Sequence, residues 1–240
     1  DRSQVQDYIL QRFEKEDVIM SEKYEEMKSF FDARVSGYDE KMAATIEEYD
    51  NFYRNVATPI EKTDKPIEVL DLGAGTGIEL EYIFENAPNA RITAVDLSEE
   101  MLKKLVKKYE AHHKQIRTIA DSYLSIDLAP HSYDYIVTVM SLHHLMPAKK
   151  IYLYKKLREA LISGGAFIEG DYIVSTEEEK RLLNEFYQYK KNNPLIEDGE
   201  YHIDIPFSEE AQMQALKDAG FQNVNVLFRT PRANVVVANV

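Results

Sequence analysis

The 240-residue sequence contains no cysteine and no tryptophan, and its apolar residues form only short runs. Without cysteine the chain has neither disulfide bonds nor thiolate metal sites. A helix that crosses a bilayer needs about 18 to 20 apolar residues in succession, which this sequence does not offer. The first residues are polar and charged and lack the apolar core of a signal peptide. We therefore expect a soluble, cytoplasmic protein without a membrane segment.

Positive charge is also scarce, because 29 lysine and arginine residues face 42 aspartate and glutamate residues and the net charge is −13. Electrostatic binding of nucleic acid needs clustered lysine and arginine side chains. The composition therefore favours a small-molecule partner over a nucleic acid.

Apolar residues recur at helical spacing from Val5 to Val35, which predicts two N-terminal helices. We assign residues 1–58 to an N-terminal helical cap. Beyond Pro59, short apolar runs alternate with amphipathic segments, as in β-α-β units whose parallel sheet is covered on both faces. The predicted strands cover residues 67–72, 91–95, 116–120, 135–140 and 166–174, and the predicted helices cover residues 78–86, 98–112 and 148–161.

The pattern changes again after Val174. A Glu-rich helix and the Asn-Asn-Pro breaker at residues 192–194 form an insertion of about residues 175–207. A helix over residues 208–219 follows, and Gly220 is placed to cap it. Two final apolar runs, at residues 224–228 and 235–240, predict a closing antiparallel pair. Residues 59–240 thus form one α/β domain.

A glycine-rich loop, Asp-Leu-Gly-Ala-Gly-Thr-Gly at residues 71–77, joins a predicted strand to a predicted helix. Glycine lets the backbone approach a ligand closely there. The dinucleotide fingerprint G-x-G-x-x-G/A requires a small residue where this sequence has Ile78. S-adenosylmethionine (SAM) carries an ammonium and a sulfonium instead of a pyrophosphate, and Asp71 suits these cations. The loop therefore predicts SAM, with a dinucleotide-dependent dehydrogenase as the weaker alternative.

Two more acids, Asp96 and Asp121, end the next two predicted strands. Asp96 is placed to accept hydrogen bonds from ribose hydroxyls, and Asp121 from an adenine amino group. Each acid alone is as readily a turn or cap residue, but their succession after a glycine loop favours a cofactor site. Leu97, Met101 and Tyr123 supply apolar walls for an adenine ring. The predicted cofactor-binding residues are Asp71, Gly73, Ala74, Gly75, Gly77, Asp96, Leu97, Met101, Asp121, Ser122, Met140 and Tyr38.

The stretch from Ile67 to Val174 resembles the class I SAM-dependent methyltransferases. Residues 71–77 resemble their first motif, Asp96 the second, Asp121 the third, and residues 133–137 the fourth. The resemblance implies a Rossmann-like α/β fold. It has a seven-stranded, mostly parallel sheet in the order 3-2-1-4-5-7-6, with strand 7 antiparallel and helices on both faces.

Residues 31–35, the Gly164-Gly165 pair and residues 219–221 resemble, less specifically, one branch of this family. That branch contains the carboxy-SAM synthases and a tRNA wobble-uridine methyltransferase. Its carboxylated cofactor requires an arginine from the region before the last helix, and this sequence has no arginine between Arg181 and Arg229. We therefore expect methyl transfer rather than carboxylate transfer.

The candidate catalytic residues are His143 and His144, which follow the fourth predicted strand, where ligands bind in open α/β sheets. Histidine takes up a proton near neutral pH, although methyl transfer requires only alignment when the acceptor is already nucleophilic. Purely structural roles for both histidines are the competing interpretation. We predict no metal, because a His-His pair without a spaced third ligand is a poor metal site.

We thus predict a SAM-dependent methyltransferase with a small-molecule acceptor. A tRNA acceptor, carboxy-SAM synthesis and a SAM-binding protein without catalysis remain the alternatives. The N-terminal helices are expected to cover the cofactor site or to form a homodimer interface. In the family fold the lysine pairs at 103–104 and 107–108 lie on the opposite face of the sheet from those at 149–150 and 155–156. We interpret all four pairs as solvated helix faces.

Overall fold

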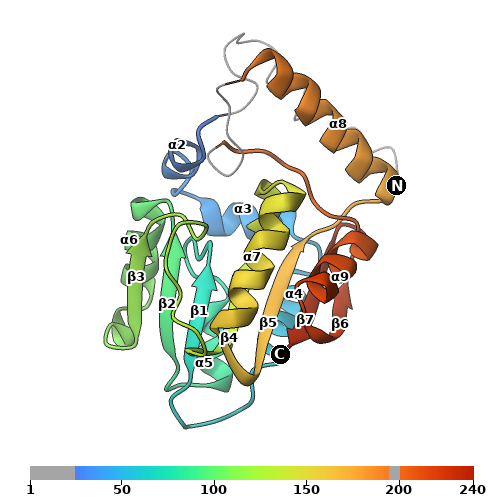
Figure 1. Ribbon diagram of the computed structural model, residues 1–240. Helices are drawn as coiled ribbons and strands as arrows, with labels where there is room; N and C mark the ends of the chain where they lie inside the picture. The colour runs from blue at the N-terminus through green and yellow to red at the C-terminus, as the bar shows by residue number, and fades with distance from the viewer. Residues whose placement is uncertain (1–24, 195–200) are drawn as a thin grey trace.

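The computed structural model describes residues 25–194 and 201–240, which fold around one seven-stranded sheet in the order β3-β2-β1-β4-β5-β7-β6 (Figure 1). The first five strands are parallel, and β7 runs antiparallel to both β5 and β6. The predicted strand order and the antiparallel strand 7 are confirmed. The strands are β1 (Glu68–Leu72), β2 (Arg91–Asp96), β3 (Ile116–Ala120), β4 (Tyr133–Val139), β5 (Leu161–Tyr172), β6 (Gln222–Arg229) and β7 (Ala233–Asn239).

Helices cover both faces of this sheet. On one face lie α4 (Tyr49–Ala57), α5 (Leu80–Asn86) and α6 (Glu99–Lys108); on the other lie α7 (Pro147–Ala160) and α9 (Glu209–Asp218). Successive strand residues point to opposite faces. Val69 therefore packs in the α4–α6 layer, while Leu70 and Leu72 pack in the α7–α9 layer. Burial on both faces explains why the strand sequences are continuously apolar.

The N-terminal region differs from the prediction. Residues 5–24 of the two expected helices lie outside the described residues, and the remainder forms only the short helix α2 (Met27–Asp32). The Glu26 side chain caps α2 by accepting hydrogen bonds from the backbone N–H groups of Lys28 and Ser29. Two further helices follow, α3 (Tyr38–Thr45) and α4, which the pattern analysis did not separate.

The predicted boundary of the cap at residue 58 also changes. Helix α4 packs directly on the sheet, with Phe52 and Val56 fully buried in the same core as β5 and β7. It is therefore a layer of the α/β domain, and only α2 and α3 extend over the sheet. Apolar residues at helical spacing show which side of a helix is buried. They do not show whether that side packs on the face of a sheet or over its end.

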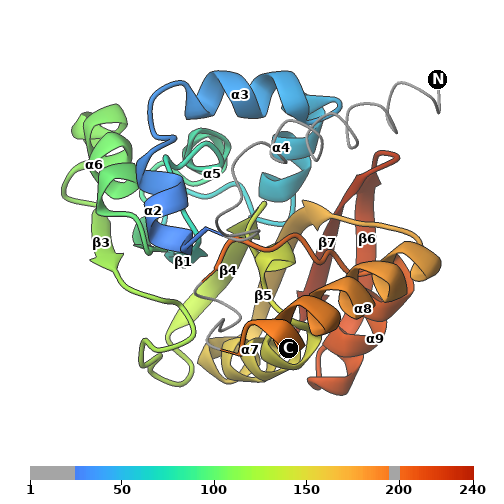
Figure 2. The same cartoon turned by 90° about the horizontal axis from the view of Figure 1, so that it is seen from above.

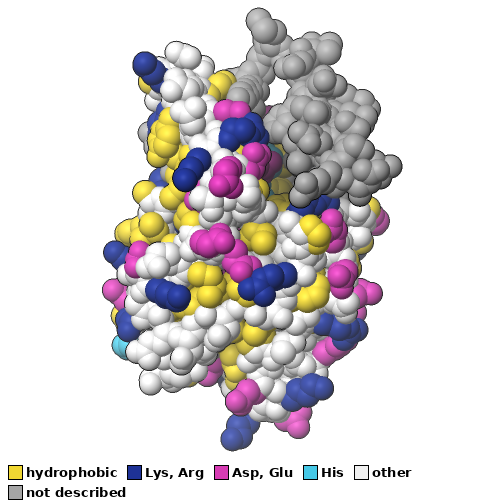
Figure 3. Space-filling model, turned by 90° about the vertical axis from the view of Figure 1, so that its right-hand side faces the viewer, with side chains coloured by type: hydrophobic (Ala, Val, Ile, Leu, Met, Phe, Trp, Pro, Cys, Tyr) yellow, Lys and Arg dark blue, Asp and Glu magenta, His cyan; other side chains and the backbone are white. Residues whose placement is uncertain are grey.

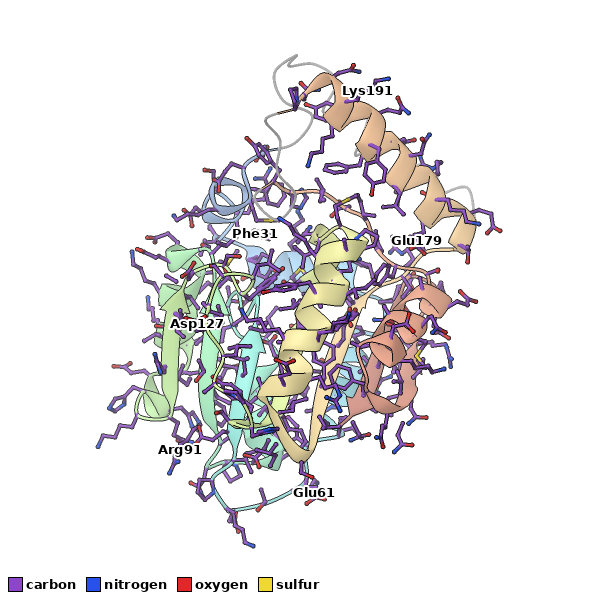
Figure 4. The ribbon with its side chains drawn as sticks, in the orientation of Figure 1. Phe31, Glu61, Arg91, Asp127, Glu179 and Lys191 are labelled. Atoms are coloured by element: carbon purple, nitrogen blue, oxygen red, sulfur yellow. The ribbon has the colours of Figure 1, made fainter. Side chains whose placement is uncertain are left out.

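The carboxyl ends of the parallel strands form the edge over which α2 and α3 lie (Figure 2). Phe31 of α2 lies above this edge, whereas Glu61 and Arg91 mark the opposite end of the sheet (Figure 4). Helix α8 (Thr176–Asn192) begins at the N-cap Ser175 and lies above α7 and α9 (Figure 2). The segment of residues 201–207 then crosses above β4 and β5 on its way to α9.

Close approach of α4 to β5 depends on Gly170, where a Cβ would lie 2.9 Å from Phe52 Cζ and 3.0 Å from Val56 Cγ2. We expect Gly170→Ala to lower the free energy of unfolding by about 1 to 3 kcal/mol, because a packed core resists an added methyl group. The melting temperature should fall by about 2 to 4 °C for each kcal/mol. Phe52→Leu in the same chain should remove part of this loss. Strictly additive effects of the two substitutions in urea unfolding would contradict the contact.

Candidate functional site

The glycine loop after β1 is held in a conformation that suits glycine. Gly73 has φ 69° and Gly75 has φ 51°, both in the left-handed region. A Cβ at Gly73 would lie 2.1 Å from Ser141 Oγ, so the loop after β1 contacts the residue that follows β4 only because it lacks a side chain there. The loop backbone is thereby exposed toward the space between the ends of these two strands.

Asp96, at the end of β2, fixes the loop from its other side. Its Oδ2 accepts the backbone N–H of Gly75 at 2.8 Å, and its Oδ1 accepts that of Ser98 at 2.8 Å. Burial raises the pKa of this carboxyl group, and the two backbone hydrogen bonds oppose that effect. A carboxylate has about four lone-pair positions, so Asp96 keeps acceptor capacity for a pair of ligand hydroxyls.

Asp71 lies beneath the loop in full burial. Neither of its carboxyl oxygens has a hydrogen-bond donor among the described residues, and the same is true of Glu79 Oε1. Burial and the neighbouring Glu79 carboxyl raise the pKa of Asp71 well above its usual value. Two neighbouring buried acids form an environment that a ligand's ammonium group would stabilise.

A cavity of about 570 Å³, counting its open mouth, joins the glycine loop to the ends of β2, β3 and β4. Eight predicted cofactor residues and His144 line it. The lining residues are Met27, Phe31, Tyr38, Gly73, Gly75, Asp96, Leu97, Met101, Ser122, Tyr123, Leu124, Met140, Ser141 and His144.

Four predicted cofactor residues do not line this cavity: Asp71, Ala74, Gly77 and Asp121. Asp71 and Ala74 are buried under the loop, and Gly77 packs against Leu105 of α6. Asp121 is exposed, and its Oδ1 accepts hydrogen bonds from the Ser122 N–H and the Ser125 hydroxyl. Asp121 thus stabilises a turn, and its contact with an adenine amino group stays a prediction.

The cap is bonded to the cofactor side of the cavity. Asp32 of α2 accepts the hydroxyl of Ser98 at 2.6 Å, the residue that caps α6. Asp39 of α3 accepts the hydroxyl of Thr76 in the glycine loop at 2.6 Å and pairs with Lys108 at 2.7 Å. Met27, Phe31 and Tyr38 then close the cavity from above. The expectation that the N-terminal region covers the site is confirmed for its described part, while a homodimer interface stays a prediction.

His143 is held by a buried acid that the sequence analysis did not include, Asp171 at the end of β5. Asp171 accepts the His143 backbone N–H at 2.9 Å and the ring Nδ1–H at 2.5 Å. Burial lowers the pKa of His143, but the charge and hydrogen bond of Asp171 outweigh it and raise the pKa above its usual value. Burial raises the pKa of Asp171, but the charge and hydrogen bond of His143 outweigh burial and lower this pKa below its usual value.

His144 is held by the 201–207 segment. Its Nδ1 donates to the Ile203 carbonyl at 2.7 Å, and the edge of its ring contacts Phe31 of the cap. Burial and the adjacent His143 lower the pKa of His144. Asp204 of the same segment lies 3.4 Å from His144 Nδ1 and 3.6 Å from His143 Nε2. The three side chains form a cluster, of which His144 lines the cavity and His143 and Asp204 lie behind it.

Lys150 positions the 201–207 segment. The interpretation of the lysine pair at 149–150 as a solvated helix face is therefore wrong for Lys150. Its side chain is 2% exposed, donates to the Ile205 carbonyl at 2.7 Å and lies over the Phe207 ring. The Ile205 N–H donates in turn to the His143 carbonyl at 2.8 Å. The separation of the lysine pairs on α6 and α7 by the sheet is confirmed.

Comparison with known proteins places this geometry in a family. Residues 69–165 match the family model described as a methyltransferase domain. The match supports a SAM-dependent enzyme, with SAM as its cofactor or substrate. The glycine loop at residues 71–77 lies within the matched stretch. No helix of the described residues is long and apolar enough to span a membrane.

Relatives and solved structures extend this likeness beyond the matched residues. The carboxy-S-adenosyl-L-methionine synthase of Nautilia profundicola is 26% identical over 85% of this chain and 88% of its own length. The structure of DhpI with SAM and HEP has a TM-score of 0.64 and 16% identity, over 88% of this chain and 95% of that one. Human N-acetylserotonin methyltransferase with SAM has a TM-score of 0.56 and 20% identity, over 82% of this chain and 54% of that one.

Asp171→Asn should lower the pKa of His143, because the substitution removes the negative charge that raises it. Histidine ring signals followed by NMR against pH give the measurement. Asp134→Asn, at the opposite end of β4, is the matched control and should leave the midpoint unchanged.

The same pair makes stability depend on pH in a defined direction. Because the pKa of His143 is raised, its stabilisation of the fold is complete below pH 6.5 and is lost as the pH rises through the folded-state pKa. Because the pKa of Asp171 is lowered, its stabilisation is complete above pH 3.8 and is lost as the pH falls through the folded-state pKa. The stability difference between wild type and Asp171→Asn should therefore be largest between these two values. A difference that grows above neutral pH would contradict the ion pair.

Proposed function

We propose that this chain transfers the methyl group of SAM to a small acceptor that enters beside His143, His144 and Asp204. The observation that carries the proposal is a single cavity that runs from Asp96 to His144. One end offers a carboxylate and apolar walls, and the other end adjoins the buried histidine cluster. A cofactor at the first end thus presents its reactive group to the second.

The residues of the cavity fit the parts of SAM. Leu97, Met101 and Tyr123 provide apolar surface for the adenine, and Asp96 provides acceptors for the ribose hydroxyls. The exposed backbone of Gly73 and Gly75 accommodates the methionine portion. Asp71 and Glu79 lie buried beneath the loop, and their carboxyl groups would offset the charge of the ammonium group.

Methyl transfer is an in-line displacement in which the acceptor's lone pair attacks the methyl carbon and the C–S bond electrons pass to sulfur. The chain must align the acceptor and exclude water. The cap and the 201–207 segment exclude water, because the histidine rings are buried beneath them. The histidine cluster promotes loss of the acceptor's proton, with His143 fixed in one orientation by Asp171.

A small acceptor agrees with the charges at the surface. On the face drawn in Figure 3, lysine and arginine side chains are interspersed with aspartate and glutamate. The net charge of −13 acts in the same direction, since RNA binding requires clustered positive charge. Gel-shift with total tRNA at physiological salt tests the tRNA alternative, and a retained complex would favour it.

Carboxy-SAM synthesis is the second candidate, and the names of the relatives favour it. A carboxylated cofactor needs a cationic side chain at the methyl end. Among the described residues that line the cavity there is no lysine or arginine. Mass spectrometry of the cofactor after incubation with cell extract distinguishes the two reactions, because carboxy-SAM is heavier than SAM.

Asp96→Asn should weaken binding of both SAM and S-adenosylhomocysteine by about 10- to 100-fold, since hydrogen bonds to a charged group contribute about 1.5 to 3 kcal/mol. Isothermal titration calorimetry measures the two affinities. The matched control is Asp121→Asn, which makes the same chemical change at the end of the next strand, outside the cavity. Equal weakening by both variants, or no binding by the wild type, would overturn the assignment of the cofactor end.

His143→Ala should lower the rate of methyl transfer by about 10²- to 10⁴-fold and remove the acidic limb of the pH–rate profile. Binding of SAM should change little, because His143 is not among the residues that line the cavity. His113→Ala, a change at an exposed histidine, is the control. If stability and SAM affinity fall together while the pH profile keeps its limb, His143 is structural.

A further inference from the structure

Three imidazole rings converge on one carboxylate beside the cavity, and one of them, that of His144, lines it. Asp204 Oδ1 lies 3.6 Å from His143 Nε2, 3.4 Å from His144 Nδ1 and 3.9 Å from His202 Nε2. The two adjacent histidines follow β4, and the other two residues come from the 201–207 segment, about sixty residues later. One possible ligand atom from each of His143, His144 and Asp204 lies within 4.8 Å of the others.

The tautomers of the two buried histidines are fixed by groups that only accept hydrogen bonds. His143 Nδ1 donates to the carboxylate of Asp171 at 2.5 Å, and His144 Nδ1 donates to the carbonyl of Ile203 at 2.7 Å. Each neutral ring therefore keeps its lone pair on Nε2. A metal-binding histidine almost always donates its other ring N–H to a carboxylate or a backbone carbonyl. Both kinds of supporting partner are present here.

The spacing of the groups also suits a bound ion. Two ligand atoms about 2.1 Å from a tetrahedral ion lie about 3.4 Å apart. The separation of 3.6 Å between Asp204 Oδ1 and His143 Nε2 is close to that value, and a ligand atom of His144 lies within 4.8 Å of both residues. Asp204 is 46% exposed at its side chain and so has room to adjust, whereas both histidines are fixed.

We propose that His143, His144 and Asp204 bind a divalent transition-metal ion, with His202 at its edge. The proposal deepens the proposed function, on which its catalytic part rests. Two histidines and one carboxylate leave coordination positions open for a further ligand. Asp204 supplies the third, distant ligand whose absence from the sequence pattern led to the prediction of no metal.

At such a site the acceptor's hydroxyl or thiol group takes an open position on the ion. Coordination lowers the pKa of that group, so its proton passes to solvent past the half-exposed Asp204. The oxygen or sulfur lone pair then forms a bond to the methyl carbon, and the C–S⁺ bond breaks with its electrons on the sulfur of S-adenosylhomocysteine. The metal is neither oxidised nor reduced in this step.

Titration of the full, chelator-treated chain with Co²⁺ tests the site without any assumption about the acceptor. We expect one ion per chain and a visible absorption band of nitrogen- and oxygen-ligated Co²⁺. Asp204→Asn and His143→Ala should each weaken binding at least about 100-fold. The matched controls, Asp127→Asn and His113→Ala, change an exposed acid and an exposed histidine and should bind as the wild type does.

Wild-type protein that shows no absorption band and no bound ion would overturn the proposal, as would equal binding by Asp204→Asn and Asp127→Asn in folded protein. Titration with SAM keeps the two proposals apart. A chain that binds SAM and transfers methyl groups at full rate without metal sustains the proposed function and removes the metal. A chain that binds Co²⁺ at this site but does not bind SAM supports the metal site and contradicts the proposed function.

Discussion

The hydrogen bonds that Asp96 accepts from Gly75 and Ser98 are the constraint on which the cofactor end depends. They connect the glycine loop, the end of β2 and the start of α6 through one buried carboxylate. The loop glycines adopt positive φ values that are costly for other residues, and this network keeps the loop in that conformation. The Ser98 side chain is fixed as well. Its hydroxyl accepts the Met101 N–H at the start of α6 and donates to Asp32 of the covering helix α2.

The acceptor end repeats this arrangement with a different acid. Asp171 at the end of β5 accepts two hydrogen bonds from His143, one from the backbone and one from the ring. The parallel strands thus deliver carboxylates to the same edge of the sheet, where one orients the cofactor loop and the other orients a histidine. The 201–207 segment completes this end, fastened by the buried Lys150 through the Ile205 carbonyl. Charge placed at strand ends therefore determines the geometry of both halves of the site.

The sequence predicts the cofactor half better than the acceptor half, and the reason is local. The predicted cofactor residues at the strand ends lie within three residues of a strand that periodicity locates: Gly73, Gly75, Asp96 and Leu97. Asp204 shares no motif with His143, and the contact arises from a fold-dependent crossing of the 201–207 segment. The lysine pattern on α7 likewise does not reveal the contact between Lys150 and the Ile205 carbonyl, because Ile205 lies far along the chain. The strand order was predictable because the resemblance to methyltransferases implied it, whereas α3 and α4 have no comparable signature.

A crystal structure of the full chain with S-adenosylhomocysteine shows whether one cavity presents the sulfur of SAM to the histidine cluster. We expect the ribose hydroxyls within hydrogen-bond distance of Asp96 and the sulfur facing His144. A structure in which the nucleoside lies elsewhere, or in which the sulfur faces away from His143, His144 and Asp204, would contradict it.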